Sequence, residues 1–273
     1  GIVYPSDPVN LLVRLPYPSA FVPTTAGDCQ LWLDAADSTT LTGTSPVTAW
    51  RDKSGKSRNT TSYAGTPALT TNAINGVQAI NFNGSSSFTG SIPGSGKAYT
   101  LFYVGNFNAS SGQYAGLLCF SSPGNIDYGA GGITNTKLSD TQVYSTVNGT
   151  NTVFTSNTLS IPFVYSLVID GTYINNFVNG TQQTPADRAQ SGTFNFTNYV
   201  VANRAGSTGS IFLNGYVGEI IVYLNGLATL QRQQVEGYLA WKWGLQGSLD
   251  ASNPYKAAAP STTNALGISR PAN

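Results

Sequence analysis

The chain has 273 residues, of which 40% are hydrophobic, 11% are aromatic and 9% are charged, whereas typical globular domains carry about 25% charged residues. A net charge of +1 offers no field to attract nucleic acid, so we expect no nucleic-acid partner. The longest apolar runs, such as residues 220–224, fall far short of the roughly 20 residues that span a bilayer, so we expect no membrane insertion. Neutral polar residues must cover most of the surface.

The N-terminal residues 1–27 are rich in proline. Five prolines fall in this range, at Pro5, Pro8, Pro16, Pro18 and Pro23. Because proline cannot donate a hydrogen bond to a sheet ladder, the segment cannot form a central strand. We therefore expect an extended arm that attaches the domain to a larger protein assembly.

Residues 28–256 form the body, in which short apolar or β-branched runs alternate with clusters of Gly, Asn, Ser and Thr. This rhythm is typical of a sandwich or barrel, and such folds often reach this length as one domain. Eight strands are predicted, at Gln30–Asp34, Gln78–Phe82, Tyr99–Phe107, Tyr114–Phe120, Phe163–Asp170, Tyr173–Val178, Tyr199–Ala202 and Tyr216–Leu224. Gly171 and Thr172 separate two of them and predict a hairpin.

One short helix is predicted near the C-terminus, at residues 230–243. Thr229 precedes it as a candidate N-cap, and Gly244 stands where a glycine would end it. Residues 257–273, with two prolines and many small residues, predict an irregular tail.

Two motifs at opposite ends of the body carry a family resemblance. The first is LWLDAADS at residues 31–38 with VTAWRDKSG at residues 47–55; the second is GEIIVY at residues 218–223 with VEGYLAWKWGL at residues 235–245. They resemble the opening and closing signatures of laminin-G-like and concanavalin A-like lectin/glucanase domains, which occur in bacterial surface, phage and large DNA virus proteins. The resemblance implies an all-β, two-sheet antiparallel jelly-roll sandwich whose first and last strands pair. Carbohydrate binding is frequent in that superfamily but not universal.

The residues for catalysis are scarce. A glycoside hydrolase needs two carboxyl groups about 5 to 10 Å apart, and the chain has only two glutamates, Glu219 and Glu236, neither in the Glu-x-Asp-x-x-Glu strand motif of the related glucanases. We expect solvated or capping roles for both. The absence of histidine excludes a Ser-His-Asp triad and histidine-ligated zinc. We therefore expect no enzymatic activity.

The opening motif contains candidate metal ligands. Asp34, Asp37 and Asp52 could supply the oxygen ligands that calcium prefers. Alternatively, Asp34 and Asp52 accept backbone hydrogen bonds that fix their loops. The densest basic run of the chain lies in the same region and weakens a cation site; it comprises Arg51, Lys53, Lys56 and Arg58.

The sequence allows two kinds of covalent modification, a disulfide and N-linked glycosylation. Cys29 and Cys119 either form a disulfide or act as buried thiols. Six Asn-x-Ser/Thr sequons mark possible glycosylation sites in a secretory setting, at Asn59, Asn83, Asn108, Asn148, Asn179 and Asn195.

Aromatic side chains are the best candidates for ligand contact, because a sugar ring has an apolar face and polar edges. Five tyrosines lie near Asn-rich loops, at Tyr63, Tyr114, Tyr128, Tyr144 and Tyr173. The four tryptophans belong to the two motifs and predict packing. We expect a surface-displayed, lectin-like domain that binds glycans or a host surface, extracellular and on a virion or cell. A purely structural capsid, fibre or decoration protein is the alternative, and a glycoside hydrolase comes third.

Overall fold

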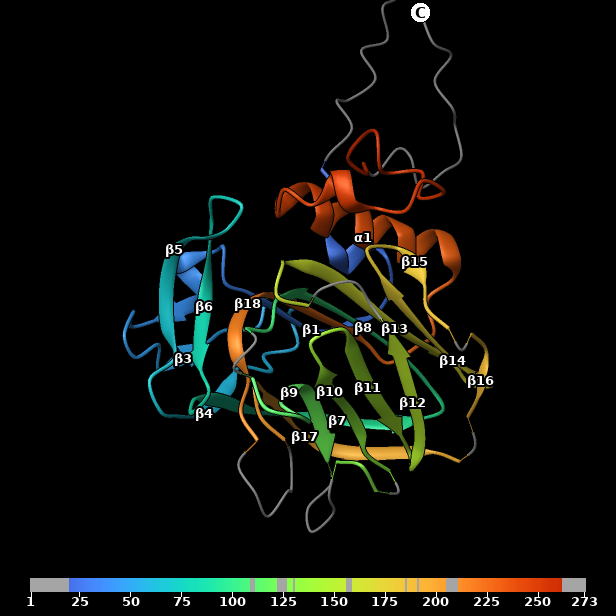
Figure 1. The fold of residues 1–273 in the computed structure, drawn as a ribbon, viewed down its shortest axis with the longest axis horizontal. Helices are drawn as coiled ribbons and strands as arrows, with labels where there is room; N and C mark the ends of the chain where they lie inside the picture. Colours follow the sequence, from blue (N-terminus) through green and yellow to red (C-terminus); the bar gives the residue numbers. More distant parts are fainter. Residues whose placement is uncertain are drawn as a thin grey trace, which may run out of the picture.

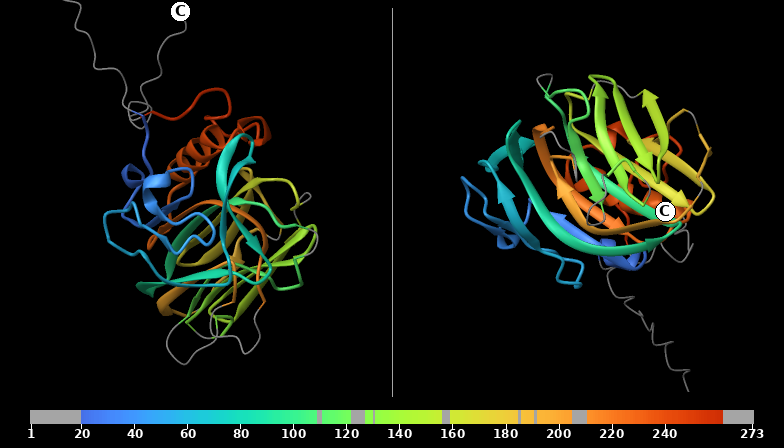
Figure 2. Two further views of the ribbon diagram at one scale, coloured as in Figure 1. Left: turned by 90° about the vertical axis from the view of Figure 1, so that its left-hand side faces the viewer. Right: turned by 90° about the horizontal axis from the view of Figure 1, so that it is seen from below.

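The computed structural model describes residues 20–108, 111–121, 127–129, 131–155, 159–184, 186–190, 192–204 and 211–261, apart from the side chains of 151–155. Two large antiparallel sheets face each other, and a helix layer covers one of them (Figures 1 and 2). The predicted all-β jelly-roll sandwich with one C-terminal helix is confirmed.

The first sheet has nine strands. They are β1 (Cys29–Asp34), β5 (Ala68–Ile74), β6 (Val77–Asn83), β8 (Ala98–Gly105), β13 (Phe163–Asp170), β14 (Tyr173–Val178), β15 (Thr181–Gln182), β16 (Arg188–Ala189) and β18 (Asn214–Tyr223). Their order is β15-β14-β13-β8-β18-β6-β5, with β16 beside β14 and β1 beside β18. The first and last strands therefore pair, as the resemblance implied, with Asp34 opposite Glu219.

The second sheet has seven strands, in the order β12-β11-β10-β9-β17-β7-β4. Their bounds are β4 (Thr60–Ala64), β7 (Ser87–Gly96), β9 (Gly116–Ser121), β10 (Ile133–Ser139), β11 (Gln142–Val147), β12 (Thr150–Thr155) and β17 (Phe194–Val201). A short pair, β2 (Leu41–Thr42) and β3 (Ala49–Trp50), lies beside the sandwich together with the 3₁₀ turns η1 (Pro23–Thr25), η2 (Ser38–Thr40) and η3 (Gln246–Ser248).

All eight predicted strands coincide with observed strands, but several others were missed. The hairpin of β13 and β14 has the predicted bounds, and Asp170 accepts hydrogen bonds from the N–H groups of Thr172 and Tyr173 in its turn. β7, β10 and β12 were missed because Gly, Ser, Thr and Asn dominate them.

Two apolar cores hold the three layers together. Between the sheets, rings such as Tyr99 and Phe120 pack edge to face, with centroids 5.3 Å apart. Beneath the helix, Phe102 and Val104 of β8 face the second core. Because neighbouring residues of β8 point alternately into the two cores, nearly every position of that strand is apolar.

The helix α1 (Thr229–Lys242) covers the side of the nine-stranded sheet that faces away from the seven-stranded sheet (Figure 1). The predicted capping role of Thr229 is wrong, because Ala228 is the N-cap and Thr229 is the first helical residue. The predicted end is confirmed: Gly244 has a φ of +66°, and the Leu245 N–H donates to the Ala240 carbonyl (2.7 Å).

Both ends of the described body lie beside α1. Ala20 and Ser261 form a β-bridge. Pro260 lies close to Gly237 of α1, and the ring of Phe21 packs against that of Tyr238 with centroids 6.0 Å apart. Phe21 is buried in the core beneath α1, so residues 20–26 pack on the body, while residues 1–19 of the expected arm lie outside the described range. Of the expected tail, residues 257–261 are described.

Candidate functional site

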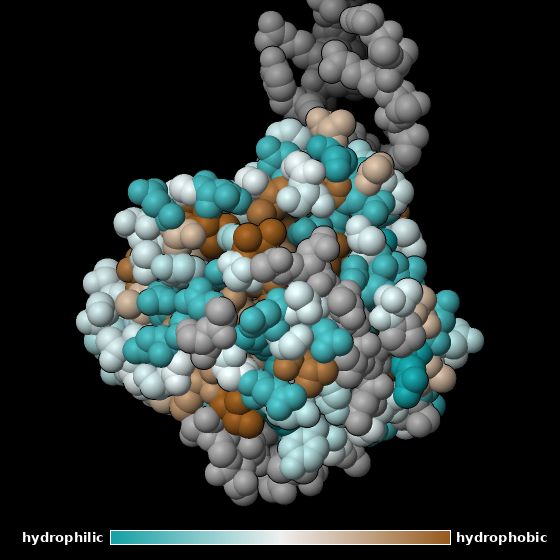
Figure 3. Space-filling view, viewed as in Figure 1, coloured by the Kyte–Doolittle hydropathy of each residue, from teal (hydrophilic) through white to brown (hydrophobic). Residues whose placement is uncertain are grey.

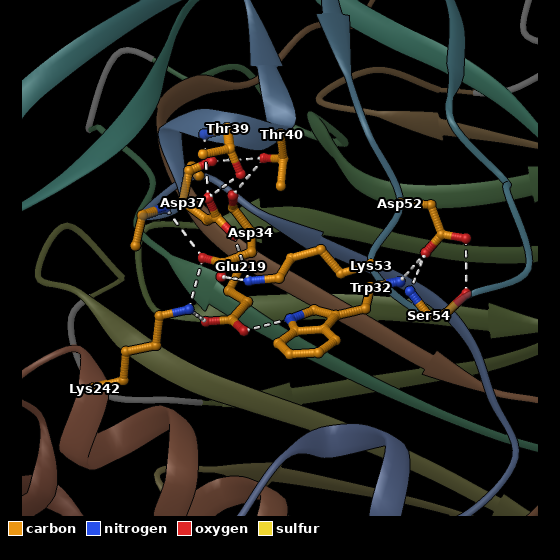
Figure 4. Close-up of polar contacts among 12 residues, drawn as sticks. Trp32, Asp34, Asp37, Thr39, Thr40, Asp52, Lys53, Ser54, Glu219 and Lys242 are labelled. Carbon is orange, nitrogen blue, oxygen red and sulfur yellow. Dashed lines mark hydrogen bonds and ion pairs between the residues drawn. The ribbon is translucent and has the colours of Figure 1, made fainter.

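Glu219 lies on β18 between the nine-stranded sheet and α1, where its side chain is fully buried. Four donors surround its carboxylate: the indole N–H groups of Trp32 (2.6 Å) and Trp243 (2.8 Å), the hydroxyl of Tyr238 (3.0 Å) and the ammonium of Lys242 (2.7 Å). Figure 4 shows Trp32 and Lys242 approaching from opposite sides. Because these donors come from the opening and closing motifs, this carboxylate ties α1 to β1 and β18.

Asp34 extends this contact into a row of alternating charges. Its carboxylate accepts from the ammonium groups of Lys242 (2.6 Å) and Lys53 (2.8 Å), and Lys53 also reaches Asp37 (2.8 Å) (Figure 4). We call Asp37, Lys53, Asp34, Lys242 and Glu219 the charge row. It joins β1, β18, α1 and the loop after β3, so its geometry is that of an internal brace.

The charge row shifts the titration of its members. Burial raises the pKa of Glu219, and the charge of Lys242 offsets part of the rise. Burial also acts to lower the pKa of Lys53, but hydrogen bonds to Asp34 and Asp37 outweigh it and raise that pKa. The hydrogen bond from Lys53 lowers the pKa of Asp37 to about 2. Lys53 and Asp37 are thus held in their charged forms.

The three candidate calcium ligands do not converge. Asp34 and Asp37 lie together, but the ammonium of Lys53 occupies the space between them, and Asp34 also accepts from the Ala36 N–H (3.1 Å). Asp52 instead accepts hydrogen bonds from three main-chain N–H groups, those of Trp32 (2.9 Å), Ser54 (2.8 Å) and Arg58 (2.9 Å). Nowhere in the described chain do three or more Asp, Glu, Cys or His side chains gather as metal ligands. The backbone-binding alternative is the one found.

Glu236 is the second buried glutamate, on the side of α1 that faces β13. It accepts from the guanidinium of Arg232 and from the Ser166 hydroxyl (2.8 Å), and Asn253 donates to its other oxygen (3.2 Å). The guanidinium of Arg232 lies 3.7 Å from the ring centre of Phe177. The expected solvated or capping roles are wrong for both glutamates, because each is enclosed between α1 and the sheet.

The tyrosine candidates separate by location. On β11, Val143 and Val147 point into the inter-sheet core, so Tyr144 points out of the sandwich. Tyr114, 36% exposed, lies against it with ring centroids 5.7 Å apart, edge to face. We call this side of the seven-stranded sheet the outer face. Tyr63 lies at the opposite edge of the sheet on β4, and Tyr173 belongs to β14 in the other sheet.

A buried ion pair that the sequence did not indicate lies beside the thiol of Cys119, which points to the same outer face. Arg204 binds Asp127 through two hydrogen bonds, of 2.7 and 2.6 Å, and both side chains are almost completely buried. The ring centre of Tyr128, which is 47% exposed, lies 5.1 Å from the guanidinium. The 77 residues between the partners leave no local pattern from which the pair could be predicted.

The cysteines are buried free thiols, so of the two alternatives the structure has the second. Cys29 faces the core beneath α1. Cys119 points to the outer face, because its neighbours Leu118 and Phe120 point into the inter-sheet core. The whole sandwich separates the two sulfurs, which prevents a bridge. Burial raises the pKa of Cys29 to about 12 and raises the pKa of Cys119 well above its ordinary value.

The six sequons fall into two groups, and their use stays a prediction. Asn59, Asn83 and Asn195 are exposed. The remaining three are half-buried, with side chains that bind other groups: Asn108 donates to Asn214 (2.8 Å), Asn148 accepts from the Gly131 N–H (2.7 Å), and Asn179 accepts from the Val164 N–H (2.9 Å).

Among the described helices, none has the length and apolar character needed to cross a membrane.

The paired first and last strands, the two antiparallel sheets and the helix layer define the class as a jelly-roll-like β-sandwich. No protein-family model and no curated protein matches the sequence. Solved structures that resemble it include domain 4 of an extracellular arabinanase from Geobacillus stearothermophilus in complex with arabinotriose. That match has a TM-score of 0.54 at 11% identity and covers 75% of this chain and 96% of that one.

Two further similar structures belong to larger chains. Trypanosoma rangeli sialidase in complex with sialic acid gives a TM-score of 0.56 at 11% identity, covering 83% of this chain and 36% of that one. Botulinum neurotoxin type C, whose cell entry depends on two ganglioside molecules, gives 0.56 at 11%, covering 78% and 52%. At such identities the likeness concerns the fold alone, and it fits a sandwich of the concanavalin A-like type.

Proposed function

We propose that this protein is a non-enzymatic, lectin-like domain that binds glycans or a host surface through the outer face. The observation that carries the proposal is the group of tyrosines there: Tyr114 against Tyr144, with Tyr128 on the same side. Aromatic rings can stack on the apolar face of a sugar while nearby polar groups bind its hydroxyls. Arabinotriose, sialic acid and gangliosides, named for the three similar structures, are all glycans or carry them.

Neutral polar groups also lie on the same face, on strands that β9 and β10 separate from β11. On the neighbouring strands β17 and β7, Asn198 lies opposite Ser91 and Val200 opposite Thr89, and all four side chains are at least partly exposed. β9 to β12 lie at the front of Figure 1. Among the described residues visible in the same view in Figure 3, most are pale or teal, with brown patches between them. Such a surface suits a hydroxyl-rich ligand better than an apolar one.

The state of the carboxylates supports binding without hydrolysis. Glu219 and Glu236 are fully buried and bound to structural partners, and Asp127 on the outer face is buried against Arg204. Glycoside hydrolysis needs two carboxyl groups that flank the scissile bond. We therefore expect no release of reducing sugar from any glycan that is bound.

We further propose an extracellular location, on a virion or cell surface, with attachment to a larger assembly through the chain ends. Support comes from Ala20 and Ser261, which pair beside α1, and α1 covers the nine-stranded sheet on the side away from the outer face. Attachment there leaves the tyrosines pointing away from the parent particle. Removing residues 1–19 while keeping Phe21 should leave stability unchanged but abolish incorporation; retained incorporation would argue against attachment by this end.

A glycan array with the purified chain tests the binding proposal. Tyr144→Ala and Tyr114→Ala should each weaken binding about two- to tenfold, the range expected for a lost aromatic contact of about 0.5 to 1.5 kcal/mol. Tyr173→Ala removes a similarly exposed ring, 41%, from the other sheet and should leave binding unchanged. A chelator should have no effect, because the aspartates of the opening motif already bind Lys53 and main-chain groups.

The outcomes separate the candidate functions. Equal losses in all three tyrosine variants would remove the outer face as the binding site. If the wild-type chain bound no glycan on the array, the purely structural capsid, fibre or decoration role would be favoured.

A further inference from the structure

We infer that the outer face selects neutral glycans and rejects those that carry a carboxylate or sulfate. This inference rests on the proposed function and adds the chemical class of the ligand. Its basis is the placement of charge: Lys137 within the seven-stranded sheet and Arg204 on its outer face are each paired with a carboxylate.

The seven-stranded sheet contains almost no charge. Across β4, β7, β9, β10, β11, β12 and β17 the only charged residue is Lys137. It lies opposite Val143, which points into the inter-sheet core, so its side chain leaves the sheet on the core side. Its ammonium binds the Ser111 carbonyl (2.8 Å) and Asp140 (2.6 Å), and its side chain is 4% exposed. The sheet therefore offers no cation to a ligand on the outer face.

Arg204 is the cation that does lie on the outer face, and Asp127 occupies it. Two parallel hydrogen bonds in a buried site are the strongest arrangement available to a guanidinium and a carboxylate. A ligand carboxylate would have to displace Asp127 from the guanidinium and leave this buried carboxylate without its cation, which is strongly unfavourable. Without displacement, the ligand anion would be desolvated next to Asp127, a like charge.

The remaining polar groups on the face are neutral. They comprise the hydroxyls of Tyr114, Tyr128 and Tyr144, the hydroxyls of Thr89 and Ser91, and the amide of Asn198. Each can donate to and accept from sugar hydroxyls without requiring an opposite charge. Since no ion pair forms across such an interface, binding should also depend little on ionic strength.

The test is an array in which each neutral glycan is printed beside its sialylated, sulfated and uronic-acid counterparts, at low and at high sodium chloride. We expect neutral glycans to be bound at both salt concentrations and their acidic counterparts at least about tenfold more weakly. Preference for an acidic counterpart, or loss of binding in high salt, would overturn the neutral class while the binding function stands. Silence on all glycans would overturn the binding function itself.

A matched pair of variants tests the cause. Asp127→Asn releases Arg204 and should add binding to sialylated glycans, whereas Asp140→Asn alters a 63% exposed partner of Lys137 on the core side and should add none. Circular dichroism checks that each variant folds. A folded Asp127→Asn chain that still rejects acidic glycans would show that the pairing of Arg204 does not set the selectivity. If that variant does not fold, the array with the wild-type chain still tests whether neutral glycans are preferred over acidic ones.

Discussion

The two sides of the sandwich use their polar residues differently. On the helix side, the charge row connects β1, β18, α1 and the loop after β3, with Asp34 and Glu219 buried, and Arg232 and Glu236 form a buried pair within α1. On the outer face, the described charges cancel in the Asp127–Arg204 pair, and tyrosines and hydroxyls provide the accessible groups. In a chain with so few charges, placing them inside leaves the opposite surface neutral.

The largest expected effect comes from breaking the charge row. Glu219→Ala leaves the indole N–H groups of Trp32 and Trp243 buried without their acceptor and removes one of the two carboxylates bound to Lys242, so it should lower the free energy of unfolding by about 3 to 5 kcal/mol. Urea denaturation followed by tryptophan fluorescence measures it. Lys56→Ala is the control, because its ion pair with Asp28 is exposed and should contribute less than about 1 kcal/mol. If both variants lost a similar amount of unfolding free energy, the buried charges of the charge row would contribute no more to stability than an exposed ion pair.

A smaller effect is expected at the end of the helix that carries this brace. Gly244 has a φ of +66°, so Gly244→Ala should lower the unfolding free energy by about 1 to 2 kcal/mol. Gly247→Ala is the matched control, since a side chain there meets no atom within 4 Å and the backbone is not left-handed. Equal unfolding midpoints for the two variants would contradict the strained helix end.

The smallest effect concerns pH. Asp37 has a pKa of about 2 in the folded chain against an ordinary value of 3.8, so the folded state releases this proton more readily than the unfolded state. Its contribution to stability is therefore complete above about pH 4 and is lost as the pH falls through about 2. Asp37→Asn should flatten the dependence of stability on pH in this window. Parallel curves of urea midpoint against pH for the two chains would refute it.

Buried glutamates act in the opposite direction. The raised pKa values of Glu219 and Glu236 mean that the folded state binds their protons more tightly, so falling pH relieves the cost of burying their charges. Both groups are present in the wild type and in Asp37→Asn. The difference between the two chains therefore isolates Asp37.

The sequence predicted those strands that have continuous apolar runs bounded by turn residues. The hairpin of β13 and β14 has an apolar run on each side of Gly171, and both strands were found with the predicted bounds. β10 was missed because only alternate residues, such as Ile133, meet the apolar core, whereas Thr134 and Thr136 lie on the other side. Strands with so few apolar residues give no strong periodic pattern.

The site was predicted less well, because its geometry depends on contacts between distant segments. Glu219 lies 187 residues from Trp32, and the environment that buries it exists only after β1 pairs with β18. A signal was nevertheless present: the two motifs contain complementary charges in Asp34, Lys53 and Lys242. Among the tyrosines, only the folded sheet distinguishes Tyr144 from Tyr63.

The bridge between Ala20 and Ser261 has a consequence for how the domain can be combined with others. Because Ala20 and Ser261 touch, residues 20–261 can be closed into a ring by a very short linker and opened elsewhere, for example at the turn after Asp170. For the same reason, residues 20–261 can be inserted into a surface loop of another protein, because the chain enters and leaves this domain at two points only one strand spacing apart.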